Sequence, residues 1–488
     1  LRLFDAKKVV RGKLITGSDE EQWCDREHFA QLYRQAIAVR RKAHEPLIRS
    51  EFYRFLFDWH RISRPARLSD TLQQYNGYAL PPFDFERMIL PERIHTSEKC
   101  EKTEHALNSL VSSGEVLPIC PIVSSAQPVR VCYLLRSSGS LFFDRGQIQE
   151  MTAAISNSAQ TVFSFLKENA ASPHQDICAG TGMTPLQVDD ALVELSRSGL
   201  VTCDDQFSFL KALQYQPVRS ERQESNWHQQ IRPAWRQQQR QSRSSTRHQV
   251  KQRLQKRSGR WIPVTAFAVM GKDLSPEERV KAQTRLLLQR YGILVKEFYR
   301  KENGLVPWSQ IFQVLKRMEW RGEVHRGYFV QGLSGIQFAL PEALERLEQI
   351  QVQENKDDSL HVLSTMDPAL PFGGWYEWDL YNVEKKPVAV TRSAANHLLF
   401  IGKNPVMYSE QYGERLVRLL DFQKEHSAIV AGAFHRFLRL SSDYRPRKQI
   451  RIRTIDGIDA ARHELQPAYG QAGYESDGAS LLLWPSRV

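Results

Sequence analysis

Apolar residues recur at helical spacing in three stretches of the chain, and each stretch then meets a glycine. The stretches and their glycines are ALNSLVSSGEVL at 106–117 with Gly114, ALVELSRSGLVT at 191–202 with Gly199, and VLKRMEWRGEVH at 314–325 with Gly322. Glycine adopts the left-handed conformation that ends a helix, and an apolar β-type segment follows at once. Because the third helix of a winged helix leads into its wing in this way, the pattern predicts two or three winged-helix domains.

Upstream helices support this prediction for the second and third copies. Thr184 is suited to cap the helix of the second copy, with Pro185 in its first turn. Helical patterns at 276–291, 295–302 and 307–321 supply three helices for the third copy. The alternative is three unrelated helical hairpins, since many helices end in glycine.

The predicted fold class is α+β, with tandem winged-helix domains followed by a small β-domain and a terminal α/β segment; the family resemblance described below implies that the β-domain is β-barrel-like. Beyond residue 357 the pattern changes to short alternating segments such as PVAVTR and NHLLFIGKN, which are typical of strands. The predicted divisions are a winged-helix-like domain with N-terminal helices at 1–120, a second winged helix at 121–216, a basic linker at 217–259, a third winged helix at 260–356, the β-barrel-like domain at 357–443 and the terminal segment at 444–488.

The net charge of +12 is concentrated in the segment between Pro217 and Arg260, which holds twelve Lys and Arg residues against two Glu. If the segment is helical, five of its arginines share one face. Arginine neutralises phosphates and tryptophan stacks on bases, although such a run also serves as a merely soluble linker. The predicted nucleic-acid-binding residues are Arg232, Trp235, Arg236, Arg240, Arg243, Arg247, Lys251 and Arg253 in the linker, Lys316 and Arg317 on the third helix, and His325 and Arg326 at the wing.

Several kinds of chemistry are not expected in this chain. Its Gly-Lys pairs are not followed by Ser or Thr, so the phosphate-binding loop of an ATPase motor is missing. The six cysteines form no C-x-x-C pair, and the histidines are dispersed, so we expect reduced cytoplasmic thiols and no metal. No run of about 18 apolar residues predicts a membrane span. Because the first residue is Leu1, we expect the chain to be part of a longer polypeptide.

Longer blocks of sequence resemble the large helicase-related (Lhr) family of bacterial ATP-dependent helicases. These blocks, in chain order, are EEQWCDREHFAQLYRQAI at 20–37, EPLIRSEFYRFLFDWHRI at 45–62, LPPFDFERMILPERI at 80–94, GYFVQGLSGIQFALPEALERL at 327–347, TMDPALPFGG at 365–374 and IRIRTIDGIDA at 450–460. The resemblance runs from about residue 20 to the end and indicates the C-terminal region of that family. Glu27 departs from the family pattern, which has a second arginine there.

The resemblance implies a nucleic-acid-binding accessory region of a helicase that unwinds DNA and RNA–DNA hybrids in DNA repair. Its partners would be single-stranded DNA or RNA and motor domains of the same polypeptide, with a homo-oligomer left open. ATP and Mg²⁺ are expected only for those motor domains, and no cofactor for this chain. Alternatives are an oligomerisation module and a DNA glycosylase, since the resemblance extends to winged-helix glycosylases that remove damaged bases.

A glycosylase needs a carboxylate in its pocket, and Asp367 and Asp477 are the acids to inspect first. The paired Gln-x-Gln or Gln-x-Asp motif of those glycosylases is not evident. Gln73 and Gln74 are adjacent instead, so no catalytic residue is assigned from the resemblance.

Overall fold

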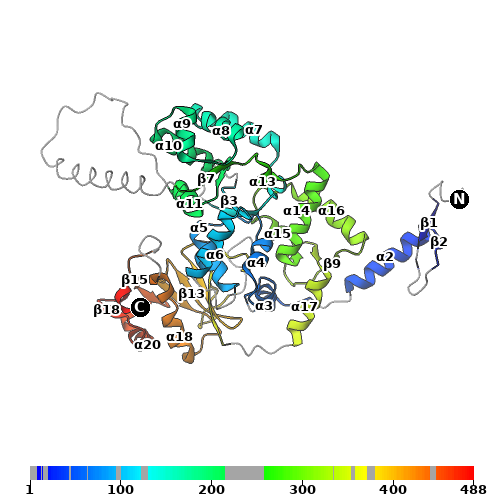
Figure 1. The fold of residues 1–488 in the computed structure, drawn as a ribbon. Helices are drawn as coiled ribbons and strands as arrows, with labels where there is room; N and C mark the ends of the chain where they lie inside the picture. Colours follow the sequence, from blue (N-terminus) through cyan, green and yellow to red (C-terminus); the bar gives the residue numbers. More distant parts are fainter. Residues whose placement is uncertain are drawn as a thin grey trace, which may run out of the picture.

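The computed structural model describes most of the chain as five consecutive parts (Figure 1). The residues it leaves undescribed are 1–7, 13, 15–19, 43–45, 63, 95–100, 122–129, 215–257, 334, 353–357, 371–379 and 440–446. No helix among the residues it does describe is both long enough and apolar enough to cross a membrane. The first part is an arm that extends to one side of the molecule. It consists of β1 (Val9–Gly12), β2 (Gln22–Asp25) and α2 (Arg26–Lys42).

The second part contains the first glycine-terminated helix. Its elements are α3 (Arg49–Trp59), α4 (Leu68–Gln74), α5 (Pro82–Asp84), η1 (Phe85–Ile89), η2 (Leu90–Glu92), α6 (Glu101–Ser112), β3 (Val116–Ile119) and β4 (Cys132–Leu135). Strands β3 and β4 pair antiparallel, with Val116 opposite Leu135. This pairing carries the winged helix beyond the predicted division at residue 120.

The third part is the second winged helix. Its elements are η4 (Gly139–Leu141), α7 (Arg145–Ala154), α8 (Asn157–Asn169), β5 (Ser172–Pro173), α9 (His174–Thr181), α10 (Pro185–Arg197), β6 (Val201–Cys203), α11 (Gln206–Gln214), β7 (Arg260–Pro263) and α13 (Phe267–Met270). Thr184 caps α10 through a capping box with Gln187, as its position before Pro185 predicts. Strand β7 lies between β5 and β6, so its hydrogen bonds place residues 260–263 in this sheet and not in the next domain.

The fourth part is the third winged helix. Its elements are α14 (Pro276–Tyr291), β8 (Ile293–Leu294), α15 (Lys296–Tyr299), α16 (Trp308–Trp320), β9 (His325–Gly327), β10 (Gln337–Ala339) and α17 (Pro341–Val352). The three predicted glycines end α6, α10 and α16 with φ of 72°, 69° and 74°, and a strand follows each. The predicted pattern of helix, glycine and wing is therefore confirmed in all three copies.

The fifth part is a β-rich domain. Its elements are β11 (Leu360–Ser364), β12 (His397–Ile401), β13 (Asn404–Glu410), β14 (Arg415–Arg418), η5 (Lys424–His426), α18 (Ser427–Gly432), α19 (His435–Leu438), β15 (Ile450–Ile452), β16 (Thr454–Ile455), β17 (Ile458–Asp459), η6 (Ala460–Arg462), α20 (Gln466–Gln471), β18 (Glu475–Asp477), β19 (Ser480–Leu483) and η7 (Pro485–Arg487).

The predicted barrel is wrong, because the main sheet is open. Its order is β11-β12-β13-β14-β16-β17, and among the described strands β11 and β17 do not pair with each other to close it. Strands β16 and β17 come from the predicted terminal segment and join through a parallel pair between β14 and β16. One sheet therefore spans the predicted division at 443, and β15, β19 and β18 form a second, smaller sheet.

Helix α3 is buried on two sides, in two different cores. Phe52, Phe55 and Leu56 lie in the core of the third winged helix, with Leu287, Leu315 and Phe338 among others. Tyr53 and Phe57 lie in a core shared with Leu398 and Phe400 of the β-rich domain. An aromatic or leucine side chain of this size contributes about 1.5–3 kcal/mol when fully buried, so α3 fixes both neighbours.

A buried ion pair joins the first winged helix to the β-rich domain. The guanidinium of Arg93 donates to the Oδ1 atom of Asp367 at 2.6 Å, and both side chains are fully buried. Arg93 also donates to the Tyr75 hydroxyl at 2.9 Å and to the carbonyl of Ile89 at 2.9 Å. The backbone N–H of Ala369 donates to the same Asp367 oxygen.

The variant Asp367→Asn is expected to lower the free energy of unfolding by about 3–5 kcal/mol, because it leaves the Arg93 charge buried without its counter-ion. Urea denaturation followed by circular dichroism measures the change. Asp477→Asn is the matched control, because Asp477 is half-exposed and pairs with Arg451 at the surface. It should change stability by less than about 1 kcal/mol. Equal losses in the two variants would contradict this role of the buried pair.

Candidate nucleic-acid interface

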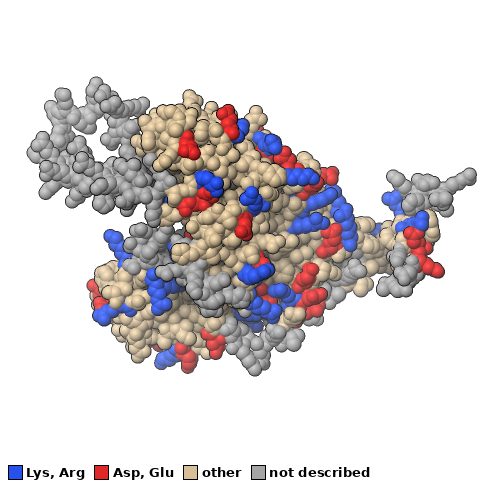
Figure 2. Space-filling model, in the orientation of Figure 1, with Lys and Arg blue, Asp and Glu red and all other residues tan. Residues whose placement is uncertain are grey.

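The exposed face of α16 is basic and carries no carboxylate. Its exposed residues are Ser309, Gln310, Gln313, Arg317, Trp320 and Arg321, with Lys316 half-buried beside them. Figure 2 shows Lys and Arg side chains gathered on the surface where α14 and α16 lie, with a few acidic side chains among them. Third helices of winged helices commonly face nucleic acid, so this face meets the charge requirement for phosphate contacts.

Glu319, the acid within α16, faces inward. Its side chain is buried and lies 3.7 Å from the guanidinium of Arg326 on β9. The charge of this predicted wing residue is therefore offset, while Arg317 has no ion pair among the described residues. Arg321 lies 3.5 Å from Glu323, and the amino group of Lys316 lies 5.4 Å from the ring centroid of Phe312.

The corresponding helix of the second winged helix is less suited to phosphates. Asp190 and the apolar Leu186 are exposed on α10. Arg197, the cation in its last turn, donates to the carbonyl of Leu213. Of the two helices, α16 therefore offers the more basic surface.

The sequence-predicted residues of the linker lie outside the described part of the chain. They are Arg232, Trp235, Arg236, Arg240, Arg243, Arg247, Lys251 and Arg253. The structure brings together the other four predicted residues, Lys316, Arg317, His325 and Arg326, on α16 and the adjoining strand β9. Sequence reasoning missed Trp320, which is more than half exposed beside them. The sequence does contain a signal for this exposure, because Trp320 follows the predicted surface residue Arg317 by three positions and so lies on the same helix face.

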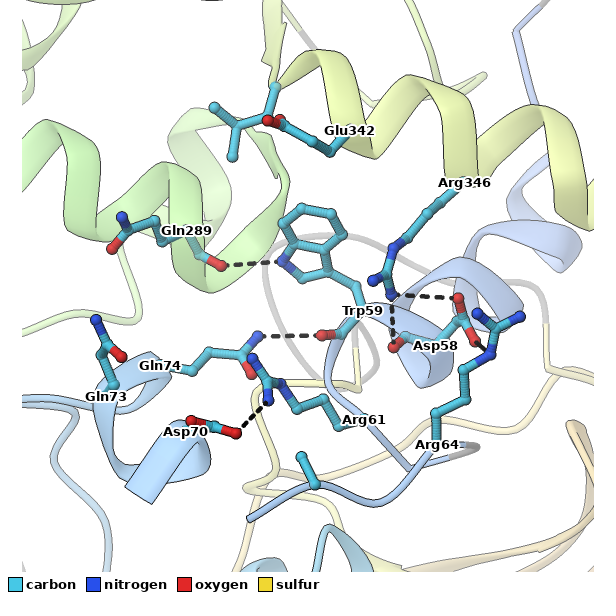
Figure 3. Close-up of a pocket in the computed structure, with 12 residues that line it drawn as sticks. Asp58, Trp59, Arg61, Arg64, Asp70, Gln73, Gln74, Gln289, Glu342 and Arg346 are labelled. Atoms are coloured by element: carbon cyan, nitrogen blue, oxygen red, sulfur yellow. Dashed lines mark hydrogen bonds and ion pairs between the residues drawn. The ribbon is translucent and has the colours of Figure 1, made fainter. Parts of the chain in front are cut away.

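A polar cavity of about 610 Å³ opens at the C-terminal end of α3 (Figure 3). Its walls come from the loop after α3, from α4, from the end of α14 and from α17, so it lies between the first and third winged helices. The lining residues are Asp58, Trp59, Arg61, Arg64, Ala66, Asp70, Gln73, Gln74, Gln289, Leu340, Glu342 and Arg346. The volume is within the range of small-molecule sites.

The charges in this cavity balance. Arg61, Arg64 and Arg346 face Asp58, Asp70 and Glu342. The buried Asp58 carboxylate lies 3.3 Å from Arg64 and 3.4 Å from Arg346, and Asp70 lies 3.8 Å from Arg61. Three positive and three negative groups favour a neutral polar occupant over an anion.

The loop between α3 and α4 begins with a strained arginine. Arg61 has φ of 65°. The backbone N–H of Arg61 donates to the carbonyl of Asp58, and the backbone N–H of Ile62 donates to the carbonyl of Phe57. This is the Schellman ending of a helix, in which glycine is the usual residue at this left-handed position. Such a conformation costs a residue with a Cβ about 1–2 kcal/mol.

Neither acid that the sequence suggested for base excision lines this cavity. Asp367 is enclosed in its ion pair with Arg93, and Asp477 lies on the exposed hairpin of β18 and β19. Gln73 and Gln74, the adjacent glutamines, do line the cavity. Sequence reasoning missed Asp58, Asp70 and Glu342, because nothing in the local pattern shows that α3, α4 and α17 meet.

Two parts of the chain match models of a known family. Residues 48–136 and residues 273–359 each match a model described as "Large helicase-related protein, winged-helix domain", the third and fourth such domains respectively. A relative from Mycolicibacterium smegmatis, named "Lhr helicase/ probable uracil glycosylase", is 27% identical over 84% of this chain. These matches support a C-terminal region of the large helicase-related (Lhr) kind.

A second Lhr relative, from Escherichia coli, is named "Lhr helicase/uracil glycosylase" and is 22% identical over 96% of this chain. The chain covers 26% of the length of the first relative and 31% of the second, so it spans about a quarter to a third of these Lhr proteins. The matches support the predicted assignment to the C-terminal region of Lhr. The two matched domains are the second and fourth parts of the fold, and both contribute walls to the cavity.

Arg61→Gly is expected to leave the free energy of unfolding unchanged or to raise it by up to about 1 kcal/mol, because glycine relieves the strain at this position. The matched change is Gly292→Ala at the end of α14, where φ is 68° and an added Cβ would lie 2.7 Å from the Trp59 ring. This variant should lose about 3 kcal/mol through strain and overlap. Urea denaturation measures both, and a large loss in Arg61→Gly would show that its side chain is structural.

Proposed function

We propose that this chain is the nucleic-acid-binding C-terminal region of an Lhr-type ATP-dependent helicase that acts in DNA repair. The observation that carries the proposal is the exposed face of α16, which presents Lys316, Arg317 and Arg321 with its one acid turned inward. Contacts to phosphate hold a strand without reading its sequence, so the region binds single-stranded DNA or RNA with little sequence preference. The printed names of the relatives support motor domains in the same polypeptide, which hydrolyse ATP with Mg²⁺.

Exchanging Lys316, Arg317 and Arg321 for Gln is expected to weaken binding to single strands and to reduce the salt slope by about 2, since each phosphate contact contributes roughly 0.7. Fluorescence anisotropy across a salt series measures the slope. The matched control exchanges Arg145, Arg260 and Arg487, which are exposed and each pair with a carboxylate, those of Asp273, Asp204 and Glu475. An equal fall in both variants would mean that net charge, and not the α16 face, determines binding.

The linker arginines give a second contribution to binding. Replacing Arg232, Arg236, Arg240, Arg243 and Arg247 together with Gln is expected to lower the same salt slope by about 3, if most of them touch phosphate. Folding should be unaffected, because the segment has few aliphatic residues to contribute to a core. If circular dichroism is native and the slope does not move, the linker only separates the domains and binding belongs to α16 and its wing.

Base excision is a second candidate function, favoured by the names of both relatives. The purified chain is then expected to leave abasic sites in a uracil-containing single strand, which alkali cleaves and gel electrophoresis detects. Asp477→Asn should not change the rate, because Asp477 lies on an exposed hairpin and does not line the cavity at the end of α3. A chain that binds the strand and leaves no abasic product lacks this function.

A further inference from the structure

The cavity at the end of α3 contains the end of a column of stacked planar groups. Phe298 stacks on Phe52 with centroids 6.1 Å apart, Phe52 on Phe55 at 5.7 Å, and Phe55 on Trp59 at 5.7 Å. The guanidinium of Arg346 then lies over the Trp59 ring, 5.4 Å from its centroid. Arg346 is the last group of this series, and its side chain lines the cavity together with Trp59.

The backbone and the carboxylate of Asp58 contact the Arg346 guanidinium. Its Nη1 atom lies 3.4 Å from both the carbonyl oxygen and the Oδ2 atom of Asp58 (Figure 3). The indole is itself anchored, because its N–H donates to the carbonyl of Gln289 at 3.0 Å. The side chain of Arg346 remains about two-fifths exposed and lines the cavity. Guanidinium planes are surfaces on which unstacked bases stack.

The groups around this platform suit a neutral planar ligand with donor and acceptor edges. Gln74 is buried, and its Nε2 atom donates to the carbonyls of Trp59 and Arg290. Its Oε1 atom is also buried and has no hydrogen-bond partner among the described residues. An unpaired buried acceptor is costly unless a ligand or water fills the role. The exposed amides of Gln73 and Gln289 complete the set.

We infer that this cavity takes one unstacked nucleobase from the bound strand, stacked on the Arg346 guanidinium. The inference rests on the proposed function, since a bound strand must supply the base. The balanced charges exclude preference for a free phosphate, whereas a nucleobase is uncharged, planar and rich in donors and acceptors. Gln side chains present both an N–H and a carbonyl, so the site accepts more than one base.

The experiment uses the full chain and two strands of abasic spacers, one carrying a single central 2-aminopurine and the other none. The spacer strand alone measures phosphate binding, and the added base measures the cavity. We expect the base to strengthen binding by about tenfold, in line with stacking of one base on a protein group. The emission of 2-aminopurine should fall on binding as the base becomes stacked.

Arg346→Lys is the test variant, because lysine keeps the charge beside Asp58 but has no planar face. It should reduce the tenfold gain to below about twofold and prevent the fall in emission, while affinity for the spacer strand stays the same. Arg487→Lys makes the same exchange at another arginine paired with a carboxylate, Glu475, outside both proposed surfaces, and should keep the full gain. Native circular dichroism of both variants confirms folding.

The two proposals fail in different ways. A wild-type chain that does not bind the spacer strand contradicts the proposed function. A chain that binds the spacer strand but gains nothing from the base, or an Arg346→Lys variant that keeps the whole gain, overturns the inference about the cavity. If emission falls equally in Arg346→Lys, the base stacks elsewhere, and the inference is also overturned.

Discussion

The burial of α3 on two sides is the constraint on which the rest of the structure depends. Phe52 and Phe55 belong to the core of the third winged helix, and Tyr53 and Phe57 belong to the core of the β-rich domain. Neither neighbour can shift along α3 without exposing aromatic surface, because interiors are close-packed. The cavity lies where this helix ends, so its walls are held in place by two cores at once.

The buried ion pair adds specificity to this arrangement. Arg93 and Asp367 gain little net stability from each other, since removing two charges from water costs nearly as much as their attraction returns. Each of the two charges has only the other as its counter-ion among the described residues, however, so a displaced domain would leave a buried charge unpaired. Burial, with the nearby charges of Arg93, Arg290 and Lys301, holds the pKa of His60 well below its ordinary value. The neutral ring shares a hydrogen bond of 2.7 Å with the Tyr75 hydroxyl, so the junction carries no further charge there.

Local signals allowed much of this fold to be predicted from the sequence. Gly114, Gly199 and Gly322 mark the helix ends because left-handed backbone is a local requirement that only glycine meets cheaply. The membership of β7 in the second sheet could not be predicted, since it depends on pairing across more than forty residues. The inward orientation of Glu319 was missed for a related reason, because charge counting ignores which helix face a residue occupies.

The cavity, even more than β7, could not be predicted from local sequence patterns. Its residues come from four elements, and their meeting depends on the packing of α3, which no local pattern encodes. The barrel-like shape was expected from the resemblance to the Lhr family, yet closure depends on whether the two edge strands meet, and in the described part of this domain β11 and β17 do not pair. Pairing between strands distant in sequence is therefore the information that the pattern lacks.

The two surfaces proposed for nucleic acid differ in the way that their tasks require. Phosphate contacts need uncompensated cations, and α16 supplies them with Arg317 exposed and Glu319 turned away. A base needs a planar platform without excess charge, and the guanidinium of Arg346 lies over the Trp59 ring with the Asp58 carboxylate beside it. The backbone strain at Arg61 is consistent with a binding role for the cavity that this residue lines. Glycine would end the helix at a lower cost, so the presence of an arginine supports a role outside folding. Neither surface selects a sequence: phosphates are alike in every strand, and amide groups of glutamine can donate to or accept from any base. Under the proposed function, such a region holds whatever strand a motor delivers, which is the property that an accessory domain of a helicase needs.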